Sequence, residues 1–267
     1  MQLAERISSK SFFRFAGRIR KGRGDRGGQS AANLQVTSGS ALQCCVAYNK
    51  YGGYCVPMSS RHRPAAQRIL AGQIWEPETI EMLISHGNDG DVIHAGTYFG
   101  DFLPALSQCC APGRRVWAFE PNPENYQCAQ ITGYINAVRN IELINACLGE
   151  RQGARRMVTT DAAGRALGGA SRIVDCENGM AGAVTVNCVA IDEVVPEDRT
   201  VSIIQLDVEG FEKPALSGAL KTIERCTPTI ILETLPDEQW LSENILHLGY
   251  RVAGKVHDNT ILTHLSK

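Results

Sequence analysis

The sequence predicts an α/β fold in which a mainly parallel sheet carries helices on both of its faces. Short apolar runs, which are typical of buried strands, alternate with segments of helical periodicity from residue 91 onwards. Most of these runs end in a glycine or a polar residue, at Gly96, Glu120, Asn145, Asp207 and Glu233. Because parallel strands end at the same edge of a sheet, we expect these residues to meet in one crevice.

The segment before this sheet predicts a hairpin and two helices. Residues 42–47 and 54–57 are expected to pair around a turn at 49–53. Residues 64–70 and 77–85 are expected to be helical, and Pro77 fits the first turn of the second helix.

The other elements follow from the same patterns. Strands are expected at 92–93, 116–119, 141–144, 157–160, 184–191, 201–206 and 229–232, and a terminal hairpin at 250–252 and 260–262. Helices are expected from 102 to about 111, from 123 to about 138, at 214–223 and at 238–248. Asn122 is the expected N-cap of the second of these, and Tyr126, Ala129, Ile131 and Tyr134 supply much of its apolar character. Residues 164–182 are expected to form a mobile loop.

Composition excludes several classes of protein. The net charge of −1 does not favour nucleic-acid binding, and no apolar stretch approaches the roughly 18 residues of a membrane span. The ten cysteines include no Cys-x-x-Cys pair, so we expect no zinc site and no disulfide framework. They are typical of small buried side chains in a reducing compartment, which predicts a cytoplasmic protein.

Residues 1–40 differ from the rest of the chain. They are rich in Arg, Lys, Gly and Ser, and we expect a basic, flexible N-terminal extension that precedes a single domain at 41–267. The alternatives are a docking arm for a partner, a membrane-surface helix and an organelle transit peptide.

The segment Asp91–Asp101 predicts a ligand-binding turn between a strand and a helix. Gly96 and Gly100 allow the backbone to approach a ligand closely, and the following helix offers free N–H groups. The Gly-x-x-x-Gly spacing is looser than the dinucleotide pattern and suits a ligand without phosphates. The alternative is an ordinary strand-to-helix turn.

Glu120 and Asn145 end the next two predicted strands. A carboxylate at Glu120 can accept hydrogen bonds from both ribose hydroxyls of a nucleoside, the alternative being a capping or surface glutamate. The segment Asn145–Cys147 can contact an adenine ring, or it can be a plain turn.

The segment Asp207–Glu212 places three carboxylates at a strand-to-helix junction. Asp207 and Glu209 can accept a proton from a substrate hydroxyl or amine, or they can hold a divalent cation. The alternative is a helix cap, which suits Glu212.

These motifs resemble those of the FkbM-type methyltransferases, a branch of the class I S-adenosylmethionine-dependent enzymes. The resemblance spans roughly residues 48–263 and is carried by the segments 92–100, 119–123, 145–146 and 204–212, with Asp192, Leu232-Glu233 and Asp258-Asn259. It implies a seven-stranded sheet, S-adenosylmethionine as methyl donor, and O-methylation of a small molecule or sugar. We expect no resident metal ion and no nucleic-acid partner.

The resemblance also assigns roles to residues. Asp207 and Glu209 are the expected catalytic pair, with Asp207 near the reacting centre. The donor is expected to contact His94, Gly96, Thr97, Tyr98, Gly100, Asp101, Glu120, Pro121, Asn122, Asn145, Ala146 and Asp207. His94 departs from the family, which commonly has an acidic residue there that helps to hold the donor's ammonium group. Asp101 or another carboxylate would then take over that role, or the donor would sit differently; the alternative is that His94 is a core residue.

Two other functions remain open. A nicotinamide-dependent oxidoreductase would use Glu120 in the same way, but the turn lacks its third glycine. A non-catalytic nucleoside-binding module would keep the fold without the chemistry. The acceptor pocket is expected to involve segments 48–80 and 164–182, with Trp75, Glu76 and Tyr98 as lining residues. No pattern predicts the acceptor or the oligomeric state.

Overall fold

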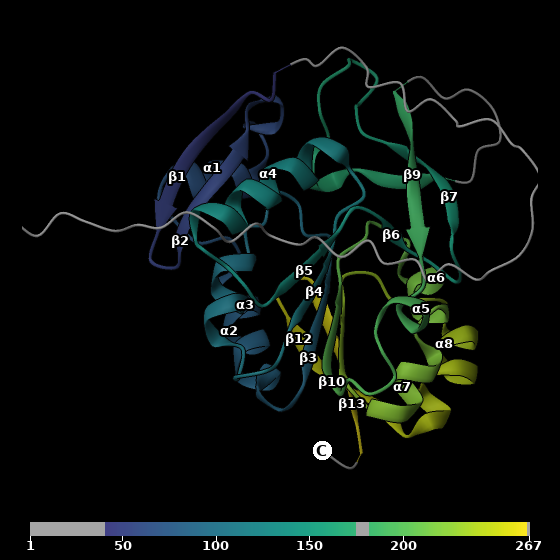
Figure 1. Ribbon diagram of the computed structural model, residues 1–267. Coiled ribbons are helices and arrows are strands. Elements are labelled where there is room, and N and C mark those ends of the chain that lie inside the picture. Colours follow the sequence, from purple (N-terminus) through teal and green to yellow (C-terminus); the bar gives the residue numbers. More distant parts are fainter. Residues whose placement is uncertain (1–40, 175–181, 266–267) are drawn as a thin grey trace, which may run out of the picture. The chain divides into compact units, whose positions relative to one another are not determined.

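The computed structural model describes residues 41–174 and 182–265 (Figure 1). The predicted basic extension at 1–40 and residues 175–181 of the predicted loop lie outside this part of the chain. The described part confirms the α/β class with a mainly parallel sheet. Within it, no helix is both long and apolar enough to cross a membrane.

The main sheet has seven strands in the order β12-β13-β11-β10-β3-β4-β5. The strands are β3 (Asp91–Ala95), β4 (Val116–Phe119), β5 (Ile141–Ile144), β10 (Val201–Leu206), β11 (Thr229–Leu232), β12 (Tyr250–Val256) and β13 (Asn259–His264). Neighbours from β11 to β5 are parallel, and β13 is antiparallel to both β11 and β12.

The register places the strand ends in one row. Ala95 pairs with Leu206 on one side and with Phe119 on the other, Phe119 pairs with Ile144, and Leu206 pairs with Leu232. The residue after each of these begins a loop at the same edge of the sheet. The predicted meeting of the strand tips is therefore confirmed for the backbone.

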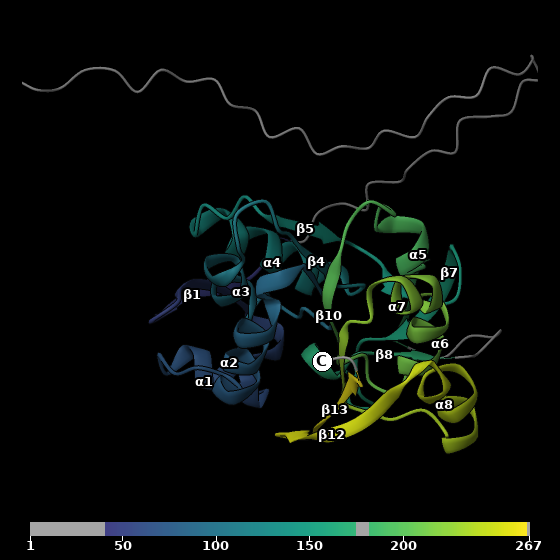
Figure 2. The ribbon, with the colours of Figure 1, turned by 90° about the horizontal axis from the view of Figure 1, so that it is seen from below.

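Helices cover both faces of the sheet (Figures 1 and 2). One face carries α2 (Pro77–His86), α3 (Leu103–Cys109) and α4 (Pro123–Ile135). The other carries α5 (Ile191–Val194), α6 (Glu212–Ser217), α7 (Leu220–Cys226) and α8 (Glu238–Asn244), which is followed by the 3₁₀ turn η4 (Leu246–Leu248). Another 3₁₀ turn, η2 (Gly87–Asp89), connects α2 to β3.

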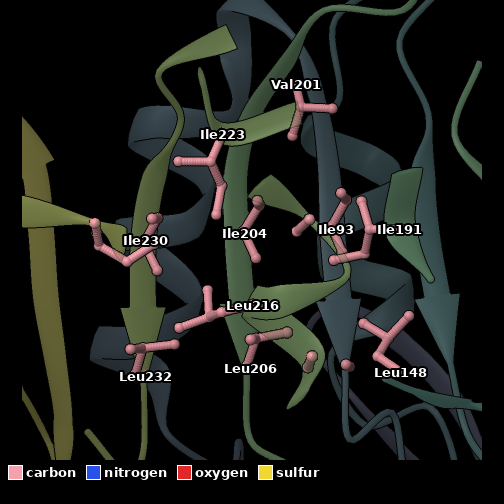
Figure 3. Close-up of a cluster of buried hydrophobic side chains, with 14 of the residues drawn as sticks. Ile93, Leu148, Ile191, Val201, Ile204, Leu206, Leu216, Ile223, Ile230 and Leu232 are labelled. Carbon is pink, nitrogen blue, oxygen red and sulfur yellow. The ribbon is translucent and has the colours of Figure 1, made fainter. Parts of the chain in front are cut away.

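Strand periodicity divides the core between the two faces. Ile93, Ile204 and Ile230 pack with α7 residue Ile223 (Figure 3). Their neighbours Val92, Ile203 and Ile231 pack on the opposite face with α2 and α3. Strands that are buried on both faces read as continuous apolar runs, and this is why their positions could be predicted closely.

The predicted hairpin is formed by β1 (Cys44–Asn49) and β2 (Gly52–Pro57), followed by the 3₁₀ turn η1 (Met58–Ser60) and α1 (Pro64–Leu70). It packs on α4 through polar contacts. The Cys55 N–H donates to Thr132 Oγ1 at 2.9 Å, and Asn136 Nδ2 donates to the Gly53 carbonyl at 2.6 Å. Of the residues expected to give α4 its apolar character, Ala129 is buried but Tyr134 is 77% exposed, and the polar Thr132 is buried instead.

A second sheet was only partly predicted. Its order is β6-β9-β7-β8, with β6 (Cys147–Leu148), β7 (Gly153–Val158), β8 (Arg172–Val174) and β9 (Ala183–Val189). The predicted strands at 157–160 and 184–191 are shifted versions of β7 and β9. The predicted loop at 164–182 instead contains the 3₁₀ turn η3 (Gly168–Ala170) and β8.

The helix predicted at 214–223 is two helices, α6 and α7. The break lies at Gly218, where a Cβ atom would come within 2.0 Å of the Gly149 carbonyl oxygen. The Gly218 carbonyl also accepts the Asp192 N–H at 2.9 Å. A contact with a distant part of the chain therefore interrupts a locally continuous helical pattern.

Candidate functional site

The glycine turn after β3 lies directly against the end of β10. Gly96 has φ +86°, and a Cβ atom on it would lie 1.9 Å from the Asp207 carbonyl oxygen. Only glycine fits such a close approach with this backbone conformation. The Gly96 and Thr97 N–H groups both donate to the Phe119 carbonyl at 3.2 Å, which ties the turn to β4 as well.

Glu120 follows β4 and holds two backbone segments. Its Oε2 accepts a hydrogen bond from the Tyr98 N–H at 2.7 Å, and its Oε1 accepts one from the Asn122 N–H at 2.8 Å. The side chain is 4% exposed, and burial raises the pKa of the carboxyl group to about 8, although both N–H donors oppose the rise. Glu120 therefore supports the left-handed turn at Tyr98, which has φ 51°.

A cavity lies at the strand tips. Among the residues predicted to contact a ligand, it is lined by Gly96, Glu120, Pro121, Ala146 and Asp207. Apolar walls that the sequence did not indicate come from Phe119, Leu148, Met157, Ile173 and Phe211. Its volume is only about 30 Å³.

The segment Gly168–Ser171, which we call the strap, makes the cavity narrow because it forms one wall. Asn125 Nδ2 donates to the Gly168 carbonyl at 3.2 Å. Asn122 Nδ2 donates to Ser171 Oγ at 3.1 Å, and this hydroxyl donates to the Gly168 carbonyl at 2.7 Å. The strap lies in the segment 164–182 that was expected to shape the acceptor pocket, but its 3₁₀ turn and its hydrogen bonds were not predicted. The Gly168-Gly169 pair was the one local signal, since bare backbone can lie close to a ligand or a ring.

Tyr98 lies beneath the strap. A Cβ atom on Gly168 would lie 2.6 Å from the Tyr98 hydroxyl oxygen, and one on Gly169 would lie 3.4 Å from the ring. The Tyr98 and Ser60 hydroxyls are hydrogen-bonded at 2.6 Å. A larger cavity of about 560 Å³ lies beyond the strap. Gly168 lines both cavities, whereas Asn122 lines only the larger one.

Carboxylates gather where β10 and β11 end. Burial, and then the neighbouring Glu233, raises the pKa of Asp207 well above its ordinary value. Burial and Glu233 also raise the pKa of Glu209 to about 7. Carboxylate oxygens of Asp207, Glu209 and Glu233 lie within 4.8 Å of one another, which is close enough to share a proton or a divalent cation.

His94 lies away from the cavity. Its Nδ1 is hydrogen-bonded to Oε1 of Gln205, the residue opposite it on β10, and its ring stacks on Phe102 at 5.4 Å between centroids. Burial lowers the pKa of His94 to about 4, so the ring is neutral at pH 7. Its Nε2 is buried without a hydrogen-bond partner in the described part of the chain.

Other residues that were predicted to contact the donor instead form hydrogen bonds with backbone carbonyl groups. Asn145 Nδ2 donates to the Glu120 and Pro121 carbonyls at 2.8 and 3.2 Å, and Thr97 Oγ1 donates to the His94 carbonyl at 3.3 Å. Thr97, Tyr98, Gly100, Asp101, Asn122 and Asn145 do not line the cavity. Burial, and then the charge of Glu76, raises the pKa of Asp101 to about 7.

The strand order, the glycine turn and the carboxylate at the end of the next strand define a Rossmann-like methyltransferase fold. The sequence matches the family model described as the methyltransferase FkbM domain over residues 94–252, and the chain belongs to this family. The comparison with curated protein sequences found no match.

Several solved structures with a similar chain trace are methyltransferases. An FkbM methyltransferase from Methylobacillus flagellatus KT has 19% identity and a TM-score of 0.45, over 66% of this chain and 43% of that one. A SAM-dependent methyltransferase from Aquifex aeolicus has 12% identity and a TM-score of 0.39, over 75% of this chain and 92% of that one. A 16S rRNA methyltransferase from T. thermophilus, solved with AdoMet and guanosine, has 14% identity and a TM-score of 0.44, over 84% and 50%. The chain spans less than half the length of the Methylobacillus protein.

Proposed function

We propose that residues 41–267 form an S-adenosylmethionine-dependent O-methyltransferase that acts on a hydroxyl group of a small molecule or carbohydrate. The observation that carries the proposal is the cavity between the Gly96 turn, Glu120, Ala146 and Asp207 in a chain of the FkbM methyltransferase family. Family membership favours methyl transfer over the nicotinamide alternative.

The cavity residues fit the donor. Glu120 lines the cavity, and each of its oxygens accepts only one backbone hydrogen bond, so acceptor capacity beyond the Asn125 side chain is left for a ribose hydroxyl. Ala146 and the apolar walls suit an adenine ring. The carboxylates of Asp207, Glu209 and Glu233 suit a cationic group at the other end. A cavity of about 30 Å³ is far smaller than a nucleoside, so the strap would move outward for the donor to bind.

S-adenosylmethionine, when bound, supplies a methyl group that is already activated on a sulfonium. The protein then has to align the acceptor oxygen and remove its proton. We assign proton removal to Asp207, with Glu209 beside it. The raised pKa of Asp207 makes its carboxylate a stronger base than an ordinary aspartate. Proton acceptance by such a group typically contributes about 10²–10⁴ in rate.

The proposal includes no resident metal ion and no nucleic-acid acceptor. The net charge is −1, and the strand tips carry several carboxylates that would repel phosphates.

Calorimetric titration of the full chain with S-adenosylmethionine, S-adenosylhomocysteine and NAD tests the proposal. We expect micromolar binding of the first two ligands and none of NAD, with binding weakened at least tenfold in Glu120→Gln. The matched control is Glu142→Gln, which changes a half-exposed carboxylate on β5 that is paired with Arg115. Binding of NAD alone would refute the proposal. Donor binding without turnover across a broad panel of hydroxylated acceptors would favour the non-catalytic module.

A further inference from the structure

Two cysteine side chains meet at the wall of the first cavity. Cys147 on β6 pairs directly with Cys188 on β9, and the two strands are parallel. Directly opposed residues on neighbouring strands project to the same face of a sheet. A Cβ atom on Gly149, two residues beyond Cys147, would lie 2.6 Å from Cys188 Sγ, so the Cys188 sulfur lies close against this strand.

The pair has the geometry that a disulfide requires. A disulfide joins residues whose Cα atoms are roughly 4.4–6.8 Å apart, and neighbouring strands, at roughly 4.7–4.9 Å, fall within this range. The two thiols are already hydrogen-bonded to each other, with Cys147 as the donor. Both are buried, and they pack with Met157 and Val186. A bond between the two sulfur atoms therefore needs little movement of the backbone.

The surroundings favour a thiolate at Cys188 and a thiol at Cys147. The hydrogen bond from Cys147 lowers the pKa of Cys188, burial opposes this effect, and the positive charge of Arg155 on β7 lowers the pKa further against the charges of Glu193 and Glu150. The same hydrogen bond, and then burial, raises the pKa of Cys147. In a thiolate beside a thiol, the thiolate can attack an oxidant and the thiol can resolve the product.

The cavity gives a small oxidant access to this pair. Cys147 lines the cavity beside Ala146, and the volume is about 30 Å³. One water molecule needs roughly 10–15 Å³, so hydrogen peroxide, which has two heavy atoms, is of a size that fits.

A second pair of thiols provides an internal comparison. Cys55 and Cys128 are also hydrogen-bonded to each other, and both are buried. Burial raises the pKa of each of these thiols, and neither lines either of the two cavities. We expect this pair to react slowly, because a protonated thiol is a poor nucleophile.

We propose that Cys147 and Cys188 form an oxidation-sensitive dithiol that hydrogen peroxide converts to a disulfide. The Cys188 thiolate attacks one oxygen of the peroxide and breaks the O–O bond, which gives a sulfenic acid and hydroxide. The hydroxide takes the thiol proton of Cys147 and leaves as water. The Cys147 sulfur then attacks the sulfenic sulfur, the S–S bond forms, and a second hydroxide leaves and is protonated by solvent. Two electrons pass from the sulfur atoms to the peroxide.

Peptide mapping of the full chain under native conditions tests the proposal. The protein is treated with hydrogen peroxide at neutral pH, remaining thiols are blocked, and cross-linked peptides are identified by mass spectrometry. We expect a Cys147–Cys188 cross-link that forms at least tenfold faster than any Cys55–Cys128 cross-link and that dithiothreitol reverses. Cys147→Ser should leave a sulfenic acid on Cys188 that dimedone labels. The control Cys226→Ser, which changes a half-buried thiol near the Arg199 carbonyl, should leave the cross-link unchanged.

Three results would overturn the proposal: recovery of both thiols unmodified, equal rates for the two pairs, or cross-linking of Cys147 or Cys188 to a different cysteine. S-adenosylhomocysteine at a concentration that calorimetry shows to be saturating should slow the cross-link at least fivefold, and an unchanged rate would overturn access through the cavity. Only this protection rests on the proposed function. If the ligand does not bind, that function fails, whereas the cross-link still tests the dithiol.

Discussion

Replacing Glu120 should destabilise the protein even when no ligand is present. Glu120→Ala removes the acceptor for the buried N–H groups of Tyr98 and Asn122. An unsatisfied buried N–H costs about 1–3 kcal/mol, so the two together cost about 2–6 kcal/mol. Part of this cost is offset, because the variant no longer buries a carboxyl group whose pKa is raised to about 8 by burial. We therefore expect a net loss of about 2–4 kcal/mol in the free energy of unfolding.

Urea denaturation at pH 7 without ligand measures this loss. The denaturation midpoint should fall while the slope stays unchanged, which indicates a change in stability alone. Glu120→Gln should lose about half as much, because its amide oxygen still accepts one of the two N–H groups. Glu142→Ala, which breaks an exposed ion pair, should lose less than about 1 kcal/mol. A midpoint for Glu120→Ala equal to that of the wild type would refute the role given to these two hydrogen bonds.

Three further predictions concern other parts of the chain. Asp91 is fully buried and accepts hydrogen bonds from Trp117 Nε1 at 2.8 Å, from Arg199 Nε at 2.7 Å and from the Arg115 N–H at 3.0 Å. Asp91→Ala should therefore lower the free energy of unfolding, measured by urea denaturation, by about 3–5 kcal/mol. A loss below about 1 kcal/mol would contradict this prediction. Gly96→Ala should abolish donor binding and lower the melting temperature, because its Cβ would lie 1.9 Å from the Asp207 carbonyl oxygen. The control Gly133→Ala lies in α4, where a Cβ meets nothing within 4 Å, and should stabilise the protein by about 0.5–1 kcal/mol. Equal melting temperatures for the two variants would contradict the close approach at Gly96. Asp101 and Glu120 have folded-state pKa values of about 7 and 8, above their ordinary values, so the folded state binds more protons than the unfolded state from about pH 4 to pH 8. Their stabilising contribution is complete at low pH and is lost as pH rises through these values, and the free energy of unfolding falls by up to about 1.4 kcal/mol per pH unit and group. The urea midpoint should therefore be lower at pH 8.5 than at pH 6.5. A higher midpoint at pH 8.5 would contradict the raised pKa values.

The elements that could be predicted well are those whose pattern is local. The predicted strand 201–206 coincides with β10. A strand that is buried on both faces has an almost continuous run of apolar residues, which is easily recognised in the sequence. The face of α4 could not be predicted, because Thr132 is buried by its hydrogen bonds with Cys55 and Phe99 in distant segments. The turn η3 and strand β8 depend on contacts with Asn122, Tyr98 and β7, which lie far away in the chain.

The candidate site shows the same division. The register of the sheet brings the residues after β3, β4 and β10 together, and this follows from the strand pattern. The strand pattern does not predict the orientation of a side chain that forms a hydrogen bond with a distant residue. His94 bonds to Gln205 and Asn145 bonds to the Glu120 carbonyl, so neither lines the cavity. Glu76 was predicted only as one of several pocket residues, since its position depends on Asn259 at the far end of the chain.

The pairing of β3 with β10 has a consequence for synthesis of the protein. His94 and its partner Gln205 are 111 residues apart, although their strands are neighbours in the sheet. At about 5–20 residues per second, a ribosome takes on the order of ten seconds to make the intervening chain. During that time β3 has an uncovered edge and apolar residues on both faces, which are features that favour aggregation. The nascent chain can therefore complete its central sheet only after most of it has been translated, and it is most exposed to chaperones and proteases before β10 emerges.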